Sequence, residues 1–165
     1  MFDKIENLHD LLEVKLQGLY DAENQLLKAM PQLSAKATDP QLRQSLDQHL
    51  RETENQVARL EQVASNLGMD LNGPGCKAME GMVDEANMLL SMRADDDVRD
   101  AAIISAAQGV EHYEIAQYGT VVAFARRLGY EAEARMLADT LTEEKTTNDL
   151  LTQLAEAAVN EKANG

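Results

Sequence analysis

Four glutamates, Glu23, Glu52, Glu111 and Glu144, fall on or beside the apolar stripes of four predicted helices. Three of them occupy a position where a core residue is expected, and Glu52 lies directly beside its stripe. A bare carboxylate in a protein core is strongly destabilising, so buried carboxylates either take up protons or bind cations. These residue types in this pattern therefore indicate a metal site.

The four glutamates are also predicted to lie at one height. In an antiparallel helical hairpin, residues equally far from the turn lie side by side. Glu23 and Glu52 are equally far from KATDP (36–40), and Glu111 and Glu144 are equally far from LGY (128–130). At 1.5 Å per residue these distances are about 22 and about 25 Å, near the middle of such a bundle. A single inward glutamate is more often a surface residue whose helical phase was misread. Four at one height predict two divalent metal ions.

Two further side chains are candidate ligands. His49 precedes Glu52 by three residues and Glu114 follows Glu111 by three, a spacing that places each pair on one helix face. The alternative for His49 is a hydrogen-bonded core histidine, and the alternative for Glu114 is a surface ion pair. His112 points about 100° away from its neighbour Glu111 and is expected to flank the site or face solvent.

The pattern departs from the usual bundle site, in which two of the glutamates are each followed three residues later by a histidine. Neither Glu52 nor Glu144 has such a histidine. Gln56 and Gln108 are candidates for orienting the carboxylates from outside the ligand shell. Tyr118 lies two turns from Glu111 on the same face, where it either hydrogen-bonds the site or is an ordinary core residue.

The elements that must position these residues are all helices. Helix formers dominate, and no alternating β-branched run occurs. Asp39 is a plausible N-cap before Pro40, and Gly68 and Gly129 are plausible C-caps. The predicted helices span about 3–36, 40–67, 76–92, 98–128 and 131–160. We expect one all-α domain, 1–165, in which four long helices form a bundle and the short helix crosses between the second and third. A simple up-down-up-down path remains an alternative.

Charge and cysteine content limit the partners. The chain of 165 residues carries a formal net charge of −14, which disfavours nucleic acid and anionic membranes. No apolar run is long enough to span a bilayer, and the N-terminus is too polar for a signal peptide. The single cysteine, Cys76, fits a reducing compartment. We therefore expect a cytoplasmic protein.

Several segments resemble the YciE/YciF family of bacterial ferritin-like stress proteins, and its YciF branch most. They are DAENQL (21–26), QHLRETENQ (48–56), CKAMEGMVDEAN (76–87), VRDAAIISAAQGVEHYEIAQYGT (98–120), LGY (128–130) and LTEEKTTNDLL (141–151). The resemblance implies a ferritin-like bundle with a crossover helix, a homodimer rather than a cage, a di-iron or related di-metal centre, and induction under stress. The family's acidic positions fall on Glu23, Glu52, Glu111 and Glu144, with His49 and Glu114 also matching its motifs.

Two functional hypotheses follow. In the first, carboxylates hold two ions, iron or else manganese, and the protein oxidises Fe(II) or consumes peroxide as a di-iron oxidoreductase. In the second, the bundle is a non-catalytic dimeric stress or binding protein without a functional metal centre. Iron storage is a third, weaker hypothesis, because it requires a cage.

Overall fold

The computed structural model describes residues 4–164, and all regular structure within that range is helical. The helices are α1 (Leu8–Lys36), α2 (Pro40–Leu67), α3 (Lys77–Ser91), α4 (Asp96–Leu128), α5 (Glu131–Leu154), a π-helical turn η1 (Ala155–Val159) and α6 (Asn160–Ala163). The predicted all-α class is confirmed.

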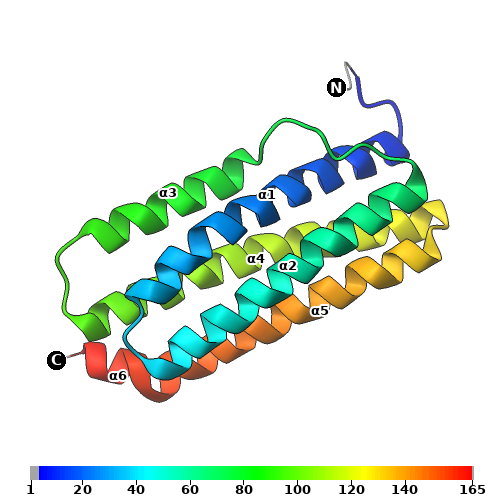
Figure 1. Ribbon diagram of the computed structural model, residues 1–165. Helices are drawn as coiled ribbons and strands as arrows, with labels where there is room; N and C mark the ends of the chain where they lie inside the picture. Colours follow the sequence, from blue (N-terminus) through cyan, green and yellow to red (C-terminus); the bar gives the residue numbers. More distant parts are fainter. Residues whose placement is uncertain (1–3, 165) are drawn as a thin grey trace.

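The four long helices α1, α2, α4 and α5 form a bundle in which each packs against two neighbours. α1 packs against α2 and α4, and α5 packs against the same two helices. α1 and α5 run in one direction and α2 and α4 in the other, while α3 returns the chain along the outside (Figure 1). This up-down-down-up order with one crossover confirms the ferritin-like bundle and excludes the simple up-down-up-down path.

Most helix ends follow from local chemistry. The Asp39 side chain accepts hydrogen bonds from the backbone N–H groups of Gln41 and Leu42, and Pro40 begins α2. Gly68 and Gly129 end α2 and α4 in the left-handed conformation, with φ of 67° and 82°. These caps agree with the sequence prediction.

Two helix ends differ from the prediction by more than two residues. The predicted start at Asp3 lies outside the described residues, and α1 begins at Leu8 because the Asn7 side chain caps it by accepting from the N–H of Asp10. The last helix was predicted as one segment to residue 160, but α5 ends at Leu154 and a π-helical turn joins it to α6. The buried side chains of Ala155 and Val159 keep this turn packed in the core.

The bundle core consists of two apolar clusters, one toward each end. The cluster near the α4–α5 turn contains Leu12, Leu16, Leu19, Leu60, Val63, Val121, Val122, Ala125 and Leu137. The cluster near the α1–α2 turn contains Ala37, Leu42, Leu46, Ile103, Ile104, Leu151, Ala155 and Val159. Residues between these sets along each helix occupy the middle of the bundle, where the predicted site lies.

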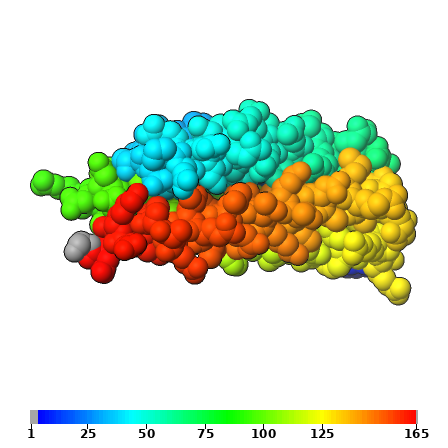
Figure 2. All heavy atoms as spheres, turned by 90° about the horizontal axis from the view of Figure 1, so that it is seen from below, coloured from blue at the N-terminus to red at the C-terminus, as the bar shows by residue number. Residues whose placement is uncertain are grey.

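The crossover helix α3 packs on the outside of α1 and α4. Its buried residue Met79 and its N-cap Cys76 join a third apolar cluster with Leu26, Met30 and Val110. On the opposite side of the bundle, α2 and α5 lie side by side along one face (Figure 2). No helix among the described residues is both long and apolar enough to traverse a membrane.

Asp100 in α4 fastens the α1–α2 turn to the bundle. It is 2% exposed. Its carboxylate accepts hydrogen bonds from the Thr38 N–H at 2.8 Å, the Thr38 hydroxyl at 2.6 Å and the Asp39 N–H at 2.7 Å. Lys162 in α6 forms an ion pair with the same turn, with its Nζ 3.2 Å from Asp39 Oδ2. These contacts fix the end of the bundle at which α1 stops and α4 starts.

Candidate metal centre

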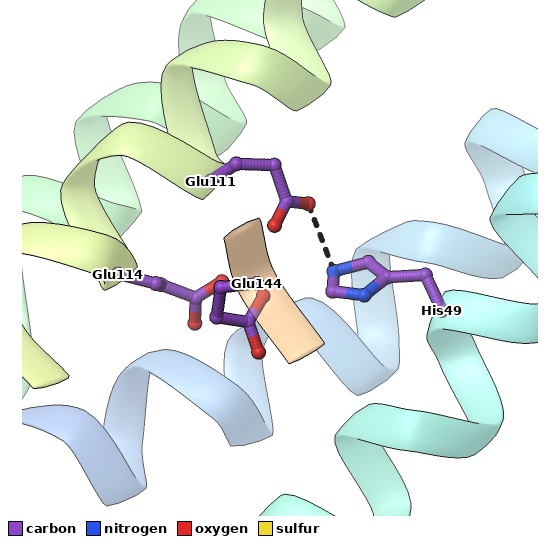
Figure 3. A group of neighbouring side chains, drawn as sticks. All are labelled: His49, Glu111, Glu114 and Glu144. Atoms are coloured by element: carbon purple, nitrogen blue, oxygen red, sulfur yellow. Dashed lines mark ion pairs between the residues drawn. The ribbon is translucent and has the colours of Figure 1, made fainter. Parts of the chain in front are cut away.

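Four buried side chains from three long helices converge between the two apolar clusters. They are His49 from α2, Glu111 and Glu114 from α4, and Glu144 from α5, and one ligand atom from each lies within 4.8 Å of the others. Figure 3 shows their polar ends turned toward one another. His49 Nε2 lies 3.1 Å from Glu111 Oε1, close enough for an ion pair, although the angle between them does not make a hydrogen bond. This group could hold a metal ion.

Glu23 brings the remaining long helix, α1, to the same region. Its side chain is fully buried, and its carboxylate Oε1 accepts a hydrogen bond of 2.5 Å from the Tyr118 hydroxyl. The charge of Glu144 acts on Glu23, as does His49. Tyr118 thus hydrogen-bonds the carboxylate cluster, one of the two roles the sequence left open for it. All four long helices contribute a potential ligand.

The polar atoms of this cluster lack the partners that buried groups normally have. Buried polar side chains in proteins are almost always hydrogen-bonded, so each exception needs a physical reason. Buried atoms without a hydrogen-bond partner are Glu23 Oε2, both ring nitrogens of His49, Thr53 Oγ1, Gln56 Oε1, Glu111 Oε2, both carboxylate oxygens of Glu114, and Glu144 Oε2. All but two of them are carboxylate oxygens or imidazole nitrogens, and these are metal-ligand atoms. A bound divalent cation fits this set, because it would satisfy acceptors and cancel negative charge together.

Burial shifts the acidity of the glutamates in one direction. Burial, together with the charge of Glu144, raises the pKa of Glu23 to about 8. Burial raises the pKa of Glu111 to about 7, and burial together with Glu111 raises the pKa of Glu144 to about 9. Burial and the neighbouring glutamates hold the pKa of Glu114 well above its usual value. Without a cation, the cluster therefore retains protons near neutral pH that exposed carboxylic acids would release.

A second layer of side chains orients the carboxylates. The Gln56 amide donates to Glu144 and also to Glu143 Oε2, the latter at 3.1 Å. The Arg59 guanidinium donates to both oxygens of Glu143 at 2.9 Å, and also to Thr140. This chain of contacts runs from the bundle surface to Glu144, so Gln56 has the orienting role expected from sequence. Neither Arg59 nor Glu143 was foreseen, because an ordinary surface ion pair has the same appearance in sequence.

Glu52 lies at the edge of the cluster rather than inside it. Its side chain is half-buried, and its Oε1 accepts a 2.8 Å hydrogen bond from the Gln48 amide in a groove between α2 and α5. Its charge still acts on Glu111. The member of α2 that faces the other glutamates is His49. The structure thus brings together four of the six predicted ligands, His49, Glu111, Glu114 and Glu144. Glu23 is buried in the same region, and Glu52 lies at its edge.

Two other polar residues of α4 are placed away from the carboxylates. The Gln108 amide donates to Thr152 at 2.8 Å and to Asn148 at 3.3 Å, both on α5, so its predicted orienting role is not supported. His112 is exposed, and its Nδ1 lies 2.8 Å from the Gln108 carbonyl oxygen. It faces away from the cluster, one of the two positions expected for it.

Comparison with known proteins gives a consistent assignment. The family model named DUF892, a domain of unknown function, matches residues 7–164. The protein YciF of Escherichia coli (strain K12) is 42% identical over 160 residues, which cover 96% of each chain.

Solved structures agree in fold. The crystal structure of the E. coli stress protein YciF has a TM-score of 0.91 at 41% identity and covers 94% of this chain and 99% of its own. YcfI of Rhodopseudomonas palustris, described as a proposed structural protein, has a TM-score of 0.88 at 43% identity and covers 92% and 98%. A Xanthomonas campestris protein, XCC3681, is 23% identical with a TM-score of 0.74, over 93% and 94% of the two chains, and shows the fold alone.

Proposed function

Because the chain belongs to the DUF892 family and is a relative of YciF, we propose that it is a ferritin-like stress protein with a di-metal centre. The proposed ligands are Glu23, Glu111, Glu114, Glu144 and His49, with Glu52 able to join them from the edge of the cluster. The proposed ions are two Fe(II), with Mn(II) as the alternative, because oxygen-rich ligand sets suit these ions better than Cu(I) or Zn(II).

The observation that carries this proposal is the set of unpartnered buried ligand atoms on all four long helices. A single buried ionisable group without a partner can be tolerated in a protein core at a cost in stability. Here three carboxylates and one imidazole converge, and the charges of Glu144 and His49 act on the buried carboxylate of Glu23 as well. Among the described residues, His49 is the one basic side chain in this group. Two divalent cations would balance the four carboxylates in charge.

The residues around the cluster have distinct roles in this proposal. Tyr118 and Gln56 hold the carboxylates of Glu23 and Glu144 in place by donating hydrogen bonds. The apolar clusters on either side exclude water from the bundle axis. The bound ions would supply one-electron redox chemistry for the oxidation of Fe(II) or the consumption of peroxide.

The test is anaerobic titration of purified protein with Fe(II) and Mn(II), followed by elemental analysis after desalting. We expect two ions per chain in the wild type and a marked loss in Glu111→Ala and Glu114→Gln. Glu80→Gln is the matched control, because Glu80 is an exposed partner of Lys77 on α3 and lies outside the cluster. Equal metal content in all four proteins would reject the metal centre.

A non-catalytic structural or binding protein is the second candidate. The description of YcfI as a proposed structural protein favours it. Burial also raises the pKa values of Glu23, Glu111 and Glu144, so these carboxyl groups can stay protonated without metal. In this case metal-free protein keeps its full function, and metal uptake is weak and unselective. Metal content after purification without chelator, measured alongside peroxide consumption, separates the two candidates.

The oligomeric state and the location in the cell expected from sequence also belong to this proposal. We propose a homodimer in the cytoplasm. The single thiol, Cys76, is buried and unpaired, as suits a reducing compartment. Size-exclusion chromatography with light scattering tests the dimer, and a cage-sized particle would favour iron storage instead.

A further inference from the structure

A small apolar cavity lies beside the candidate metal centre. Its volume of about 30 Å³ exceeds the roughly 10–15 Å³ that one water-sized molecule requires. Side chains from α1, α2, α3 and α4 line it, among them Leu26, Met30, Leu46, Ala86 and Val110. A cavity with such walls offers almost no hydrogen bonds, so it favours a small apolar occupant over water or a hydrated ion. Its size excludes an organic molecule of more than a few atoms.

Three polar side chains line this otherwise apolar cavity, and they are His49, Glu111 and Asn87 of α3. His49 and Glu111 are the members of the candidate metal centre that line it. Both are buried, at 5% and 1% exposure, and neither ring nitrogen of His49 has a hydrogen-bond partner. The cavity therefore ends at side chains whose free ligand atoms belong to the cluster.

A groove between α3 and α4 adjoins the cavity. This groove has a volume of about 130 Å³ and shares three lining residues with the cavity, Met82, Ala86 and Ala106. Met82 and Ala106 are half-buried, so they line both the solvent side and the inner side. The groove and the cavity are therefore neighbours beside the crossover helix, and His49 and Glu111 line the cavity.

We propose that the groove and the cavity together form an apolar passage through which dioxygen reaches the metal centre, and that dioxygen binds in the cavity beside it. The inference rests on the proposed function and makes dioxygen, not peroxide, the oxidant that the fold admits by this route. Dioxygen is an apolar diatomic molecule and needs no hydrogen-bond partner in transit. With Fe(II) bound, one dioxygen would take one electron from each of two Fe(II) ions, together with two protons, and would leave as hydrogen peroxide.

The first experiment does not depend on metal. Crystals of metal-free protein are pressurised with xenon, an apolar probe that occupies dry cavities. We expect a xenon peak between Ala86, Ala106 and His49 in the wild type. The Ala106→Leu variant fills the passage and should lose the peak. Ala102→Leu is the control, because Ala102 is also half-buried on α4 but lines neither the cavity nor the groove. No xenon in the wild-type cavity would overturn the proposal.

The second experiment measures the rate of Fe(II) oxidation in iron-loaded protein with dioxygen and, separately, with hydrogen peroxide. Ala106→Leu should slow the reaction with dioxygen severalfold and leave the reaction with peroxide unchanged, while Ala102→Leu should leave both unchanged. Unchanged dioxygen rates, or equal slowing with both oxidants, would overturn the proposal.

If Ala106→Leu does not fold, Ala86→Val narrows the same passage from α3. If the protein binds no iron, the proposed function is rejected. The xenon experiment still decides whether the cavity accepts an apolar gas.

Discussion

At the scale of single residues, Glu111 combines burial with a pKa near neutrality. Its side chain is 1% exposed, and burial raises its pKa to about 7. Its two carboxylate oxygens differ, since Oε1 lies 3.1 Å from His49 Nε2 and Oε2 has no hydrogen-bond partner. Protonation and cation binding are therefore competing ways of neutralising the same group, and substitutions should separate them.

Glu111→Gln should have two effects. It should lower metal content, because an amide is a poorer ligand than a carboxylate. In metal-free protein it should also reduce the loss of stability between about pH 5 and about pH 9, because the variant lacks one carboxyl group that the folded state keeps protonated beyond its unfolded pKa. Urea denaturation across this pH range and elemental analysis measure the two effects. A variant with the wild-type pH dependence would contradict the assignment of Glu111 to the cluster.

Tyr118→Phe tests the layer outside the ligands. The variant removes only the hydroxyl that donates to Glu23, and removal of such an orienting group typically weakens metal affinity by about 10–100-fold. Competition with a chelating dye measures the affinity. Tyr20→Phe is the control, because the Tyr20 hydroxyl donates to the exposed Glu61, outside the cluster. Equal loss in both variants would indicate a general effect on the bundle rather than on the site.

At the scale of elements, the helices and their order could be predicted because their signals are local. Asp39, Pro40, Gly68 and Gly129 mark helix ends through their own backbone or side chain chemistry, and the structure places helix ends there. The π-helical turn after Leu154 has no such signal. It arises where packing against the apolar cluster, rather than a capping residue, determines the path of the chain.

The sequence placed Glu52 beside the apolar stripe of α2, but how far its side chain reaches into the cluster could not be predicted, for the same reason. Residues three apart lie only about 60° apart around a helix, and both fit a stripe of about 100°. Packing of α2 against α1 and α5 sets the rotation that turns His49 inward and leaves Glu52 half-buried. The height of the site along the bundle was predictable because it depends on distance from the turns, which a small rotation does not change.

Asp100→Ala tests how the α1–α2 turn is held. The variant removes three hydrogen bonds to a buried carboxylate and leaves the N–H groups of Thr38 and Asp39 without these acceptors. We expect the free energy of unfolding to fall by about 2–4 kcal/mol, as measured by urea denaturation. Asp96→Ala is the control, since its exposed ion pair with Arg99 should contribute less than about 1 kcal/mol. A loss no larger than the control would show that the turn holds without Asp100.

At the scale of the whole molecule, the cluster links stability to pH. Unfolded glutamates titrate near 4.5, whereas the folded pKa values of Glu111, Glu23 and Glu144 are about 7, about 8 and about 9, since burial disfavours their charged forms. Between these limits the folded protein holds more protons than the unfolded one. The stabilisation from these protons is complete below pH 4.5 and is lost as pH rises through the folded values. Metal-free protein should therefore be less stable at about pH 9 than at about pH 5.

Metal should reverse this trend. Ions bind the ionised carboxylates, so binding should release protons and stabilise the folded state most at high pH. At a free metal concentration of one hundred times Kd, linkage alone adds about 2.7 kcal/mol. Calorimetry in two buffers of different ionisation enthalpy measures the released protons, and thermal unfolding with and without Mn(II) measures the stabilisation. Metal-free protein whose stability rises steadily from about pH 5 to about pH 9 would contradict the buried cluster.

The spread of the ligands along the chain also has a consequence for timing. The five buried side chains of the proposed site begin at Glu23 and end at Glu144, and no single hairpin holds the whole set. During synthesis, the complete site cannot exist until α5 has left the ribosome and docked on α2 and α4. The complete site therefore cannot guide the folding of the first hairpin or the crossover. A truncated chain that lacks α5 also lacks Glu144, so it should bind the ions less tightly than the whole chain.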